Sequence, residues 1–256
     1  MNICQVVIDD GWGGVEAWVH ELARCLRDKG ENVSIILNQE LVRYFADLEN
    51  ITLFNIGHSY PPKSIVPHIT AERIRNYFLR RALLLLYLYL DEPLRYWHYC
   101  RVRKEVAQFF SDNHIEIIHC HSPAASILVS KLTEVRIPTV VANHGEHALR
   151  GTLLPHPLAK TPIKWRATRF AEALGKADKV QVSGNFMFKA MEDWGIPLAG
   201  KPVVIPTGIN IAEIKNASPV SSFKLRGNFN LLFPGGPKQT KAETSSWWHW
   251  PRCGIK

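Results

Sequence analysis

The stretch that decides the fold is NICQVVIDDGWGGVEAWVHELARCLRDK, residues 2–29. Its first seven residues form an apolar run of strand length, and the run ends in a segment that contains Gly13 and Gly14. After the glycines, apolar residues recur at the i, i+3, i+4, i+7 spacing of an amphipathic helix, namely Val15, Trp18, Val19, Leu22, Ala23 and Leu26. The stretch therefore predicts a strand, a tight turn and a helix.

The glycine turn admits two interpretations. A helix start presents free backbone N–H groups at the positive end of the helix dipole. Adjacent Gly13 and Gly14 would let an anion approach that backbone with no Cβ in the way. The spacing matches neither the G-x-G-x-x-G of dinucleotide-binding proteins nor a Walker A loop. These residues alone favour an anion site and a plain turn equally.

The composition bounds the class of protein. A chain of 256 residues, 46% of them hydrophobic, can bury a substantial core as one large domain or two small ones. Five scattered cysteines without a CxxC pair favour free thiols in a reducing, cytoplasmic compartment. The chain opens on a strand-like run rather than on a basic signal-peptide segment. Its longest apolar run, Ala82 to Leu90, is too short to span a bilayer.

Strand-like and helix-like segments alternate along the chain. We expect strands at residues 2–8, 33–37, 51–55, 116–119, 139–142, 179–182 and 203–205, and helices near 15–29, 70–91, 94–113, 122–134, 163–175 and 184–194. This alternation predicts an α/β fold, a Rossmann-like parallel sheet with helices on both faces. All strands would then end at one edge, where ligands bind in such folds.

Three polar clusters follow predicted strands and would meet at that edge: residues 11–16, 119–122 (HCHS) and 143–147 (NHGEH). The histidine spacings could supply metal ligands, but no H-E-x-x-H or carboxylate–cysteine set completes a site, so we expect no metal. We expect His119 to be a buried histidine with its hydrogen bonds satisfied. We expect His121 and His144, further into loops, to make polar contacts to a ligand.

Five segments in order carry a resemblance to a family. They are Gly13-Gly14-Val15-Glu16 with HELARCLRDKGENVSII, then IEIIHCHSP, IPTVVANHGEH, ADKVQVSGNFMFKAMEDWGIP and KPVVIPTGIN. The set resembles the GT-B fold glycosyltransferases of the retaining family four. In the last segment, Thr207 and Asn210 of this chain stand where that family has Asn and Asp. The resemblance covers about residues 2–241.

The resemblance implies a function and a site. In that family the first domain binds the acceptor, the second binds a nucleotide-sugar, and the sugar is transferred between them to a lipid-linked or saccharide acceptor. It implies that Gly13 and Gly14 lie against the donor diphosphate, and that His144 contacts the donor sugar near the reacting carbon. His121 and Glu16 would contact acceptor or sugar. The family uses no protein nucleophile and no cofactor beyond the donor substrate, because preorganised donors stabilise the leaving diphosphate.

The resemblance ends abruptly. Residues 230–242, NLLFPGGPKQTKA, resemble the first strand and loop of the second domain, with Gly236 where the family has Arg, and with Lys241 matching its phosphate-binding lysine. We therefore expect the N-terminal domain at 1–210, a linker at 211–229, the start of a missing donor-binding domain at 230–241, and an aberrant tail at 242–256. The tail favours a frameshift over a naturally divergent end.

Three functional hypotheses follow from that ending. The first is a glycosyltransferase that is inactive alone because its donor-binding domain is missing. The second is a non-catalytic acceptor-binding module or decayed fragment. The third is a fragment of a GT-B-type sugar-nucleotide epimerase.

A basic and apolar segment suggests a membrane partner. Residues 71–104 hold eight basic and three acidic residues, which accounts for five of the eight net positive charges. Arginines precede the apolar run (Arg73, Arg75, Arg80 and Arg81), and aromatic residues follow it. This pattern is typical of a helix lying on an anionic membrane, here the inner face of the cell membrane. A buried core helix is the alternative, and nucleic acid is not expected because apolar residues do not contact phosphates. Self-association is expected from apolar surface left without a partner domain.

Overall fold

A computed structural model describes residues 1–9, 13–58, 77–132, 136–144, 160–193, 202–206 and 208. The chain divides into two units, Met1–Gly208 and Ile209–Lys256. Every described residue lies in the first unit. The expected linker, the start of a second domain with Lys241, and the tail all lie outside the described residues, so those domain limits stay predictions.

The described residues form one parallel sheet of seven strands: β1 (Asn2–Val7), β2 (Asn32–Leu37), β3 (Thr52–Asn55), β4 (Ile117–Cys120), β5 (Thr139–Asn143), β6 (Lys179–Val182) and β7 (Val203–Val204). The order is β3-β2-β1-β4-β5-β6-β7. The chain therefore builds outward from β1 in one direction and from β4 in the other. The expected Rossmann-like α/β fold is confirmed, and the switch in direction between β1 and β4 marks where ligands bind in such sheets.

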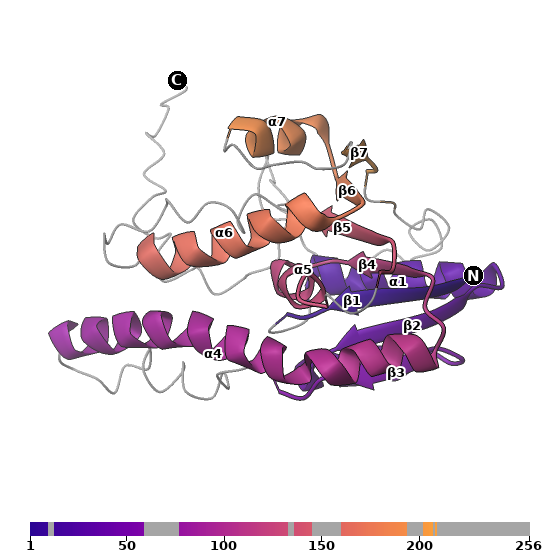
Figure 1. The fold of residues 1–256 in the computed structure, drawn as a ribbon, viewed down its shortest axis with the longest axis horizontal. Helices are drawn as coiled ribbons and strands as arrows, with labels where there is room; N and C mark the ends of the chain where they lie inside the picture. The colour runs from indigo at the N-terminus through magenta and orange to yellow at the C-terminus, as the bar shows by residue number, and fades with distance from the viewer. Residues whose placement is uncertain are drawn as a thin grey trace, which may run out of the picture. The chain divides into compact units, whose positions relative to one another are not determined.

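Helices cover both faces of this sheet (Figure 1). Buried side chains of α1 (Gly14–Asp28) and α2 (Gln39–Phe45) pack on one face. Those of α4 (Tyr77–Asp112), α5 (Pro123–Val129), α6 (Lys160–Lys176) and α7 (Asn185–Asp193) belong to the cluster on the other. Opposite faces follow from the strand period of two, because Val7 and Ile35 belong to the first cluster while Val6 and Ile36 belong to the second.

Local sequence explains where several helices begin and end. Gly30, with φ +86°, follows α1 in the left-handed region that glycine adopts without strain. Ser122 precedes α5, and its Oγ accepts a hydrogen bond from the Ala125 N–H at 3.1 Å, while Pro123 occupies the first turn. Both ends agree with the sequence-based expectation.

Three expected helices differ from the structure. The separate helices near 70–91 and 94–113 are one helix, α4, which runs through Pro93. Pro93 is exposed, so the carbonyl group that loses its N–H partner can be hydrated. The short helix α2 was not expected, because seven residues are too few to show a helical period. The helix expected at 122–134 ends at Val129.

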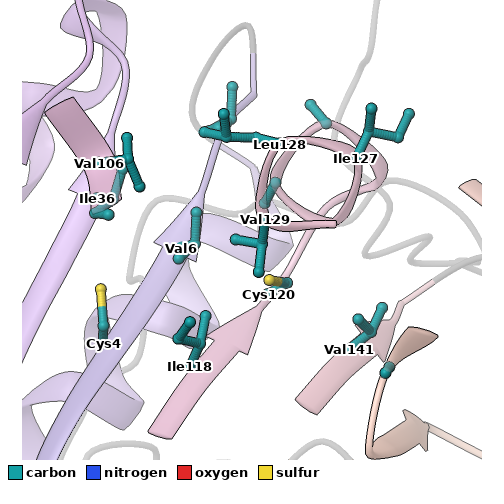
Figure 2. Close-up of a cluster of buried hydrophobic side chains, with 14 of the residues drawn as sticks. Cys4, Val6, Ile36, Val106, Ile118, Cys120, Ile127, Leu128, Val129 and Val141 are labelled. Carbon is teal, nitrogen blue, oxygen red and sulfur yellow. The ribbon is translucent and has the colours of Figure 1, made fainter. Parts of the chain in front are cut away.

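The larger apolar cluster lies between the sheet and the helices α4, α5 and α6. Figure 2 shows Val6, Ile118 and Cys120 of the strands near the α5 side chain of Val129, and Cys4 beside Ile36 and the α4 residue Val106. Cys4 and Cys120 are free, fully buried thiols, and burial raises the pKa of both well above the ordinary value. They serve as small apolar side chains in this core.

Candidate functional site

Three histidines meet beside the switch between β1 and β4. His119 lies in β4, His121 directly follows that strand, and His144 directly follows β5. The ring centroids of His119 and His121 are 4.0 Å apart, and those of His121 and His144 are 5.6 Å apart. Trp18 of α1 covers all three rings at centroid distances of 6.1, 5.2 and 5.0 Å.

A hydrogen-bonded chain runs through two of these rings. Oε1 of Gln5, from β1, lies 2.5 Å from Nε2 of His121. Nδ1 of His121 lies 3.4 Å from Nε2 of His144. Gln5 and His121 are both buried, with 1% and 2% of their surface exposed, whereas His144 is half-buried. The chain therefore leads from inside the sheet to the edge of the site.

Burial keeps the three rings neutral. It lowers the pKa of His119 to about 4, with His144 lowering it further and a hydrogen bond with Gln181 opposing the shift. Burial also lowers the pKa of His121 well below its usual value, reinforced by the two neighbouring histidines. The pKa of His144 is lowered by burial alone. At neutral pH the cluster can therefore donate and accept hydrogen bonds but carries no charge.

His119 differs from the sequence-based expectation in two respects. Its side chain is half-buried rather than buried, and Gln181 hydrogen-bonds to it. Its Nε2 atom, however, is buried with no hydrogen-bond partner among the described residues. The ring is thus only partly satisfied.

The glycine turn leads directly into this cluster. Gly13 is the N-cap of α1 with extended backbone (φ −154°, ψ −163°), which any residue can adopt. A Cβ added to Gly14 would meet nothing within 4 Å. Glu16, in the first turn of the helix, is buried. The backbone angles of Gly13 and the open space around Gly14 therefore do not require glycine, and the first N–H groups of α1 lie one turn before Trp18.

The structure brings five sequence-predicted site residues to the same sheet edge: Gly13, Gly14, Glu16, His121 and His144. His121 and Glu16 are covered by protein here, so their contact with acceptor or sugar stays a prediction. Lys241, Arg73 and Arg75 lie outside the described residues. Arg80 and Arg81 lie in α4, but their side chains are outside the description.

Sequence reasoning missed Gln5, Gln181 and Trp18 as parts of the site. Gln5 and Gln181 are polar residues inside otherwise apolar strands, and that interruption is the signal that could have marked them. Trp18 fits the apolar stripe of its helix and carried no separate signal.

Metal binding finds no support in the part of the chain that the structure describes. No group of three or more His, Cys, Asp or Glu side chains there could hold an ion. A cavity of about 450 Å³ lies away from the histidines, at the amino ends of β5 and β6, lined in part by Arg136, Thr139, Lys176 and Asp178. It is therefore separate from the candidate site.

A second feature is the exposed apolar stripe of α4, formed by residues 86, 89, 90, 93 and 97. The stripe comprises Leu86 (55% exposed), Tyr89 (41%), Leu90 (50%), Pro93 and Trp97 (55%). At 3.6 residues per turn these positions share one side of the helix. The buried residues of the same helix fall on the opposite side: Tyr99, Val102, Val106, Phe109 and Phe110. The described side chains of this segment thus contradict a fully buried core helix.

Among the residues that the structure describes, no helix combines the length and the apolar character that a transmembrane span needs.

Comparison with known proteins adds a family model and several solved structures. The model of Glycosyltransferase Family 4 matches residues 12–213. Sucrose-phosphate synthase from Thermosynechococcus elongatus is similar at 13% identity and TM-score 0.56, with 84% of this chain and 51% of that chain covered. HepE from Anabaena, in complex with UDP, is similar at 14% identity and TM-score 0.52, with 83% and 45% covered. No curated protein matches the sequence.

The chain spans about half the length of both structures. A shorter sucrose-phosphate synthase chain from the same organism matches over 82% of this chain and 91% of its own, at 12% identity and TM-score 0.50. At these identities the likeness shows the fold alone.

Proposed function

The chain belongs to Glycosyltransferase Family 4, and we propose that it forms the acceptor-side half of an enzyme that transfers a sugar from a nucleotide-sugar. The acceptor is a lipid-linked molecule or a saccharide. One observation carries the proposal: the helix that follows Gly13 and Gly14 starts at the carboxyl edge of the sheet, beside its switch point, and the ring of its Trp18 lies 5.0 Å from the ring of His144. The similar Anabaena structure is a complex with UDP, which supports a nucleotide-sugar as the donor.

The glycine turn is proposed to face the donor diphosphate. Backbone strain does not explain glycine at position 13, and crowding does not explain it at Gly14, where the approach to the start of α1 is open. The free N–H groups of the first turn and the helix dipole favour a diphosphate, which carries negative charge as it leaves. Transfer then depends on preorganised donors rather than on a protein nucleophile.

His144 is proposed to contact the donor sugar near the reacting carbon. Burial lowers the pKa of its ring, which is therefore a neutral hydrogen-bonding group at pH 7. A neutral ring can orient a sugar hydroxyl without adding charge next to the reacting centre.

Diphosphate binding tests the proposal directly. We expect UDP, GDP and inorganic diphosphate to shift the backbone amide NMR signals of Gly13 and Gly14, and Gly14→Val to weaken that effect by placing a side chain in the open approach. Gly208→Val, where an added Cβ also meets nothing within 4 Å, is the matched control. Diphosphate shifts confined to other parts of the chain would refute this assignment.

Turnover by the 256-residue polypeptide on its own is the second test. Catalysis needs both reactants held in place, and this chain spans about half the length of the structures it matches. We therefore expect no steady transfer or hydrolysis with a panel of UDP- and GDP-sugars. Steady turnover that His144→Ala abolishes would contradict the expected inactivity while supporting the role of His144.

The exposed apolar stripe of α4 is proposed to dock on an anionic membrane. It lies opposite the core face of the helix, and the Arg101 guanidinium lies 5.9 Å from the Trp97 ring centroid. Aromatic and apolar side chains beside arginines suit the headgroup region of a bilayer. Each basic residue near an anionic surface adds on the order of 1 kcal/mol. A lipid-linked acceptor would then be presented at the same membrane surface.

Vesicle co-sedimentation tests the docking. We expect binding to vesicles rich in anionic lipid at low salt, weakened by Trp97→Ala and by the combined change of Arg73, Arg75, Arg80 and Arg81 to Gln. Lys29→Gln with Lys179→Gln removes charge elsewhere on the surface and should have little effect. A wild-type chain that ignores such vesicles would overturn the proposal.

Self-association is proposed for the same surface when no membrane is present, because exposed apolar patches associate in water. Light scattering should show species larger than a monomer, and Trp97→Ala should reduce them. A clean monomer at high concentration would argue against it.

A further inference from the structure

We propose that Gln5 and His121 are positioning residues that fix which nitrogen of His144 carries its proton. The inference rests on the proposed contact between His144 and the donor sugar. It assigns a role to two buried residues that would otherwise only fill space beneath α1. It also states which atom of His144 faces the ligand as an acceptor.

The first step is the bond between Gln5 and His121. Oε1 of Gln5 is a carbonyl oxygen and can only accept, so Nε2 of His121 must donate to it. His121 is neutral in its buried position and has one ring proton. That proton is therefore on Nε2, which leaves Nδ1 of His121 as an acceptor.

In the second step, the tautomer of His121 determines which nitrogen of His144 is protonated. Nδ1 of His121 accepts, so Nε2 of His144, 3.4 Å away, must carry the proton and donate it. A neutral His144 then has an unprotonated Nδ1. We infer that His144 offers a lone pair to a hydroxyl of the sugar, and does not itself donate a proton to the leaving group.

The surroundings hold this arrangement in place. The backbone N–H of His121 donates to the carbonyl of Val6 at 2.9 Å, which ties the ring to β1, the strand that carries Gln5. Trp18 packs against the rings of both His121 and His144. A histidine's ring nitrogens differ in function only when a second group sets the tautomer, and here Gln5 supplies that group.

The opposite set of donors and acceptors also satisfies every hydrogen bond in the chain, so the experiment must distinguish the two sets. If the Gln5 amide were rotated, its NH₂ group would donate to Nε2 of His121, and the protons of both rings would move to Nδ1. His144 would then present a donor to the ligand. The tautomer of His144 therefore decides the inference.

Nitrogen-15 NMR of the 256-residue chain labelled at histidine provides the test, because the chemical shift of a ring nitrogen reports whether it is protonated. Spectra of His121→Asn and His144→Gln assign the two rings. At pH 7 we expect both wild-type rings to carry the proton on Nε2 alone. Protonated Nδ1 on His144 in the wild-type protein would overturn the proposal.

Substitution of Gln5 sharpens the test. Gln5→Leu removes the acceptor, so we expect His121 and His144 to lose their single tautomer and show both forms. Gln181→Leu is the matched control, because Gln181 is a buried glutamine on the same sheet face that bonds to His119 instead. An unchanged His144 signal in Gln5→Leu would refute the positioning role.

A second variant covers the case in which Gln5→Leu does not fold. In Gln5→Glu at pH 6, we expect the new carboxyl group and His121 to share one proton in addition to the ring proton of neutral His121. Whichever group holds the shared proton on the Nε2 side, Nδ1 of His121 then carries a hydrogen. The proton of His144 should then move to Nδ1. A His144 signal identical to wild type would count against the coupling.

These measurements use the resting protein and need no turnover. Loss of the tautomer assignment would leave the glycosyltransferase proposal standing. Conversely, if His144→Ala leaves sugar binding unchanged, the proposed function is contradicted while the tautomer assignment still holds.

Discussion

The two faces of one sheet differ in what they bury. On the face covered by α4, α5 and α6, strands β1 and β4 contribute the buried apolar residues Cys4, Val6, Ile118 and Cys120 (Figure 2). Strand β6 adds Val180 and Val182 to the same cluster. The intervening residues of the same strands point to the other face, and they are Gln5, His119 and Gln181. On this second face the polar residues therefore lie beside the smaller apolar cluster that α1 and α2 form with Val7, Ile35 and Leu37.

This difference separates the residues that hold the fold together from those proposed to contact the donor sugar or to position the residue that does. Apolar side chains stabilise by leaving water, at about 25 cal/mol per Å². Buried polar side chains stabilise little and are costly when a partner is missing, as for Nε2 of His119. A cluster of buried polar groups at a ligand-binding edge is therefore better explained by function than by stability.

The largest effect is expected from breaking the apolar face. Phe110 of α4 is 1% exposed, and Phe110→Ala should lower the free energy of unfolding by about 3–5 kcal/mol, since it removes buried contacts and leaves a cavity. Urea denaturation measures it. Phe186→Ala, at a phenylalanine 63% exposed, is the control and should change stability by less than about 1 kcal/mol. Equal losses in both variants would mean that the buried contacts of Phe110 add no stability beyond those of an exposed phenylalanine.

The polar face should instead make the protein sensitive to acid. The folded-state pKa of His119 is about 4, below the ordinary value of 6.5, so the unfolded state binds a proton that the folded state does not. Stability is therefore intact above pH 6.5 and is lost as the pH falls toward 4, by about 3 kcal/mol for this group.

Substitution isolates that contribution. His119→Leu should flatten the fall in stability between pH 6.5 and 4, followed by urea denaturation at several pH values. His114→Asn, at an exposed histidine on the amino side of β4, should leave the pH profile unchanged. Identical profiles for wild type and His119→Leu would show that His119 does not cause the loss of stability in acid.

The smallest effect compares the two ends of α1, the helix that covers the polar cluster. Gly30 has φ +86°, so Gly30→Ala should cost about 1–2 kcal/mol of stability. Gly14 is helical and its Cβ position is open, so Gly14→Ala should leave stability unchanged or raise it by up to about 1 kcal/mol. Thermal unfolding measures both, and a destabilising Gly14→Ala would show that the fold itself needs this glycine.

Sequence patterns were sufficient to locate the strands, but not their order in the sheet. Each of the seven expected runs overlaps a strand, and the central strands β1 and β2 are mostly apolar because both faces of a parallel sheet are buried. Helix limits were less certain where local signals conflict, as at Pro93, where an exposed proline does not interrupt α4. The residues of the site were found only in part, since His121 and His144 stood out and Gln5 did not.

By itself, the sequence determined the α/β class, the sheet edge at which the polar clusters meet, and the family. These depend on local periodicity and on motifs that lie close together in the chain. The tertiary structure alone decided that Gln5, His121 and His144, which are 116 and 23 residues apart in turn, form one hydrogen-bonded chain. It also decided that the apolar stripe of α4 is exposed while the opposite side is core. Both depend on which strands and helices become neighbours, and that follows from packing across the whole domain rather than from any local segment.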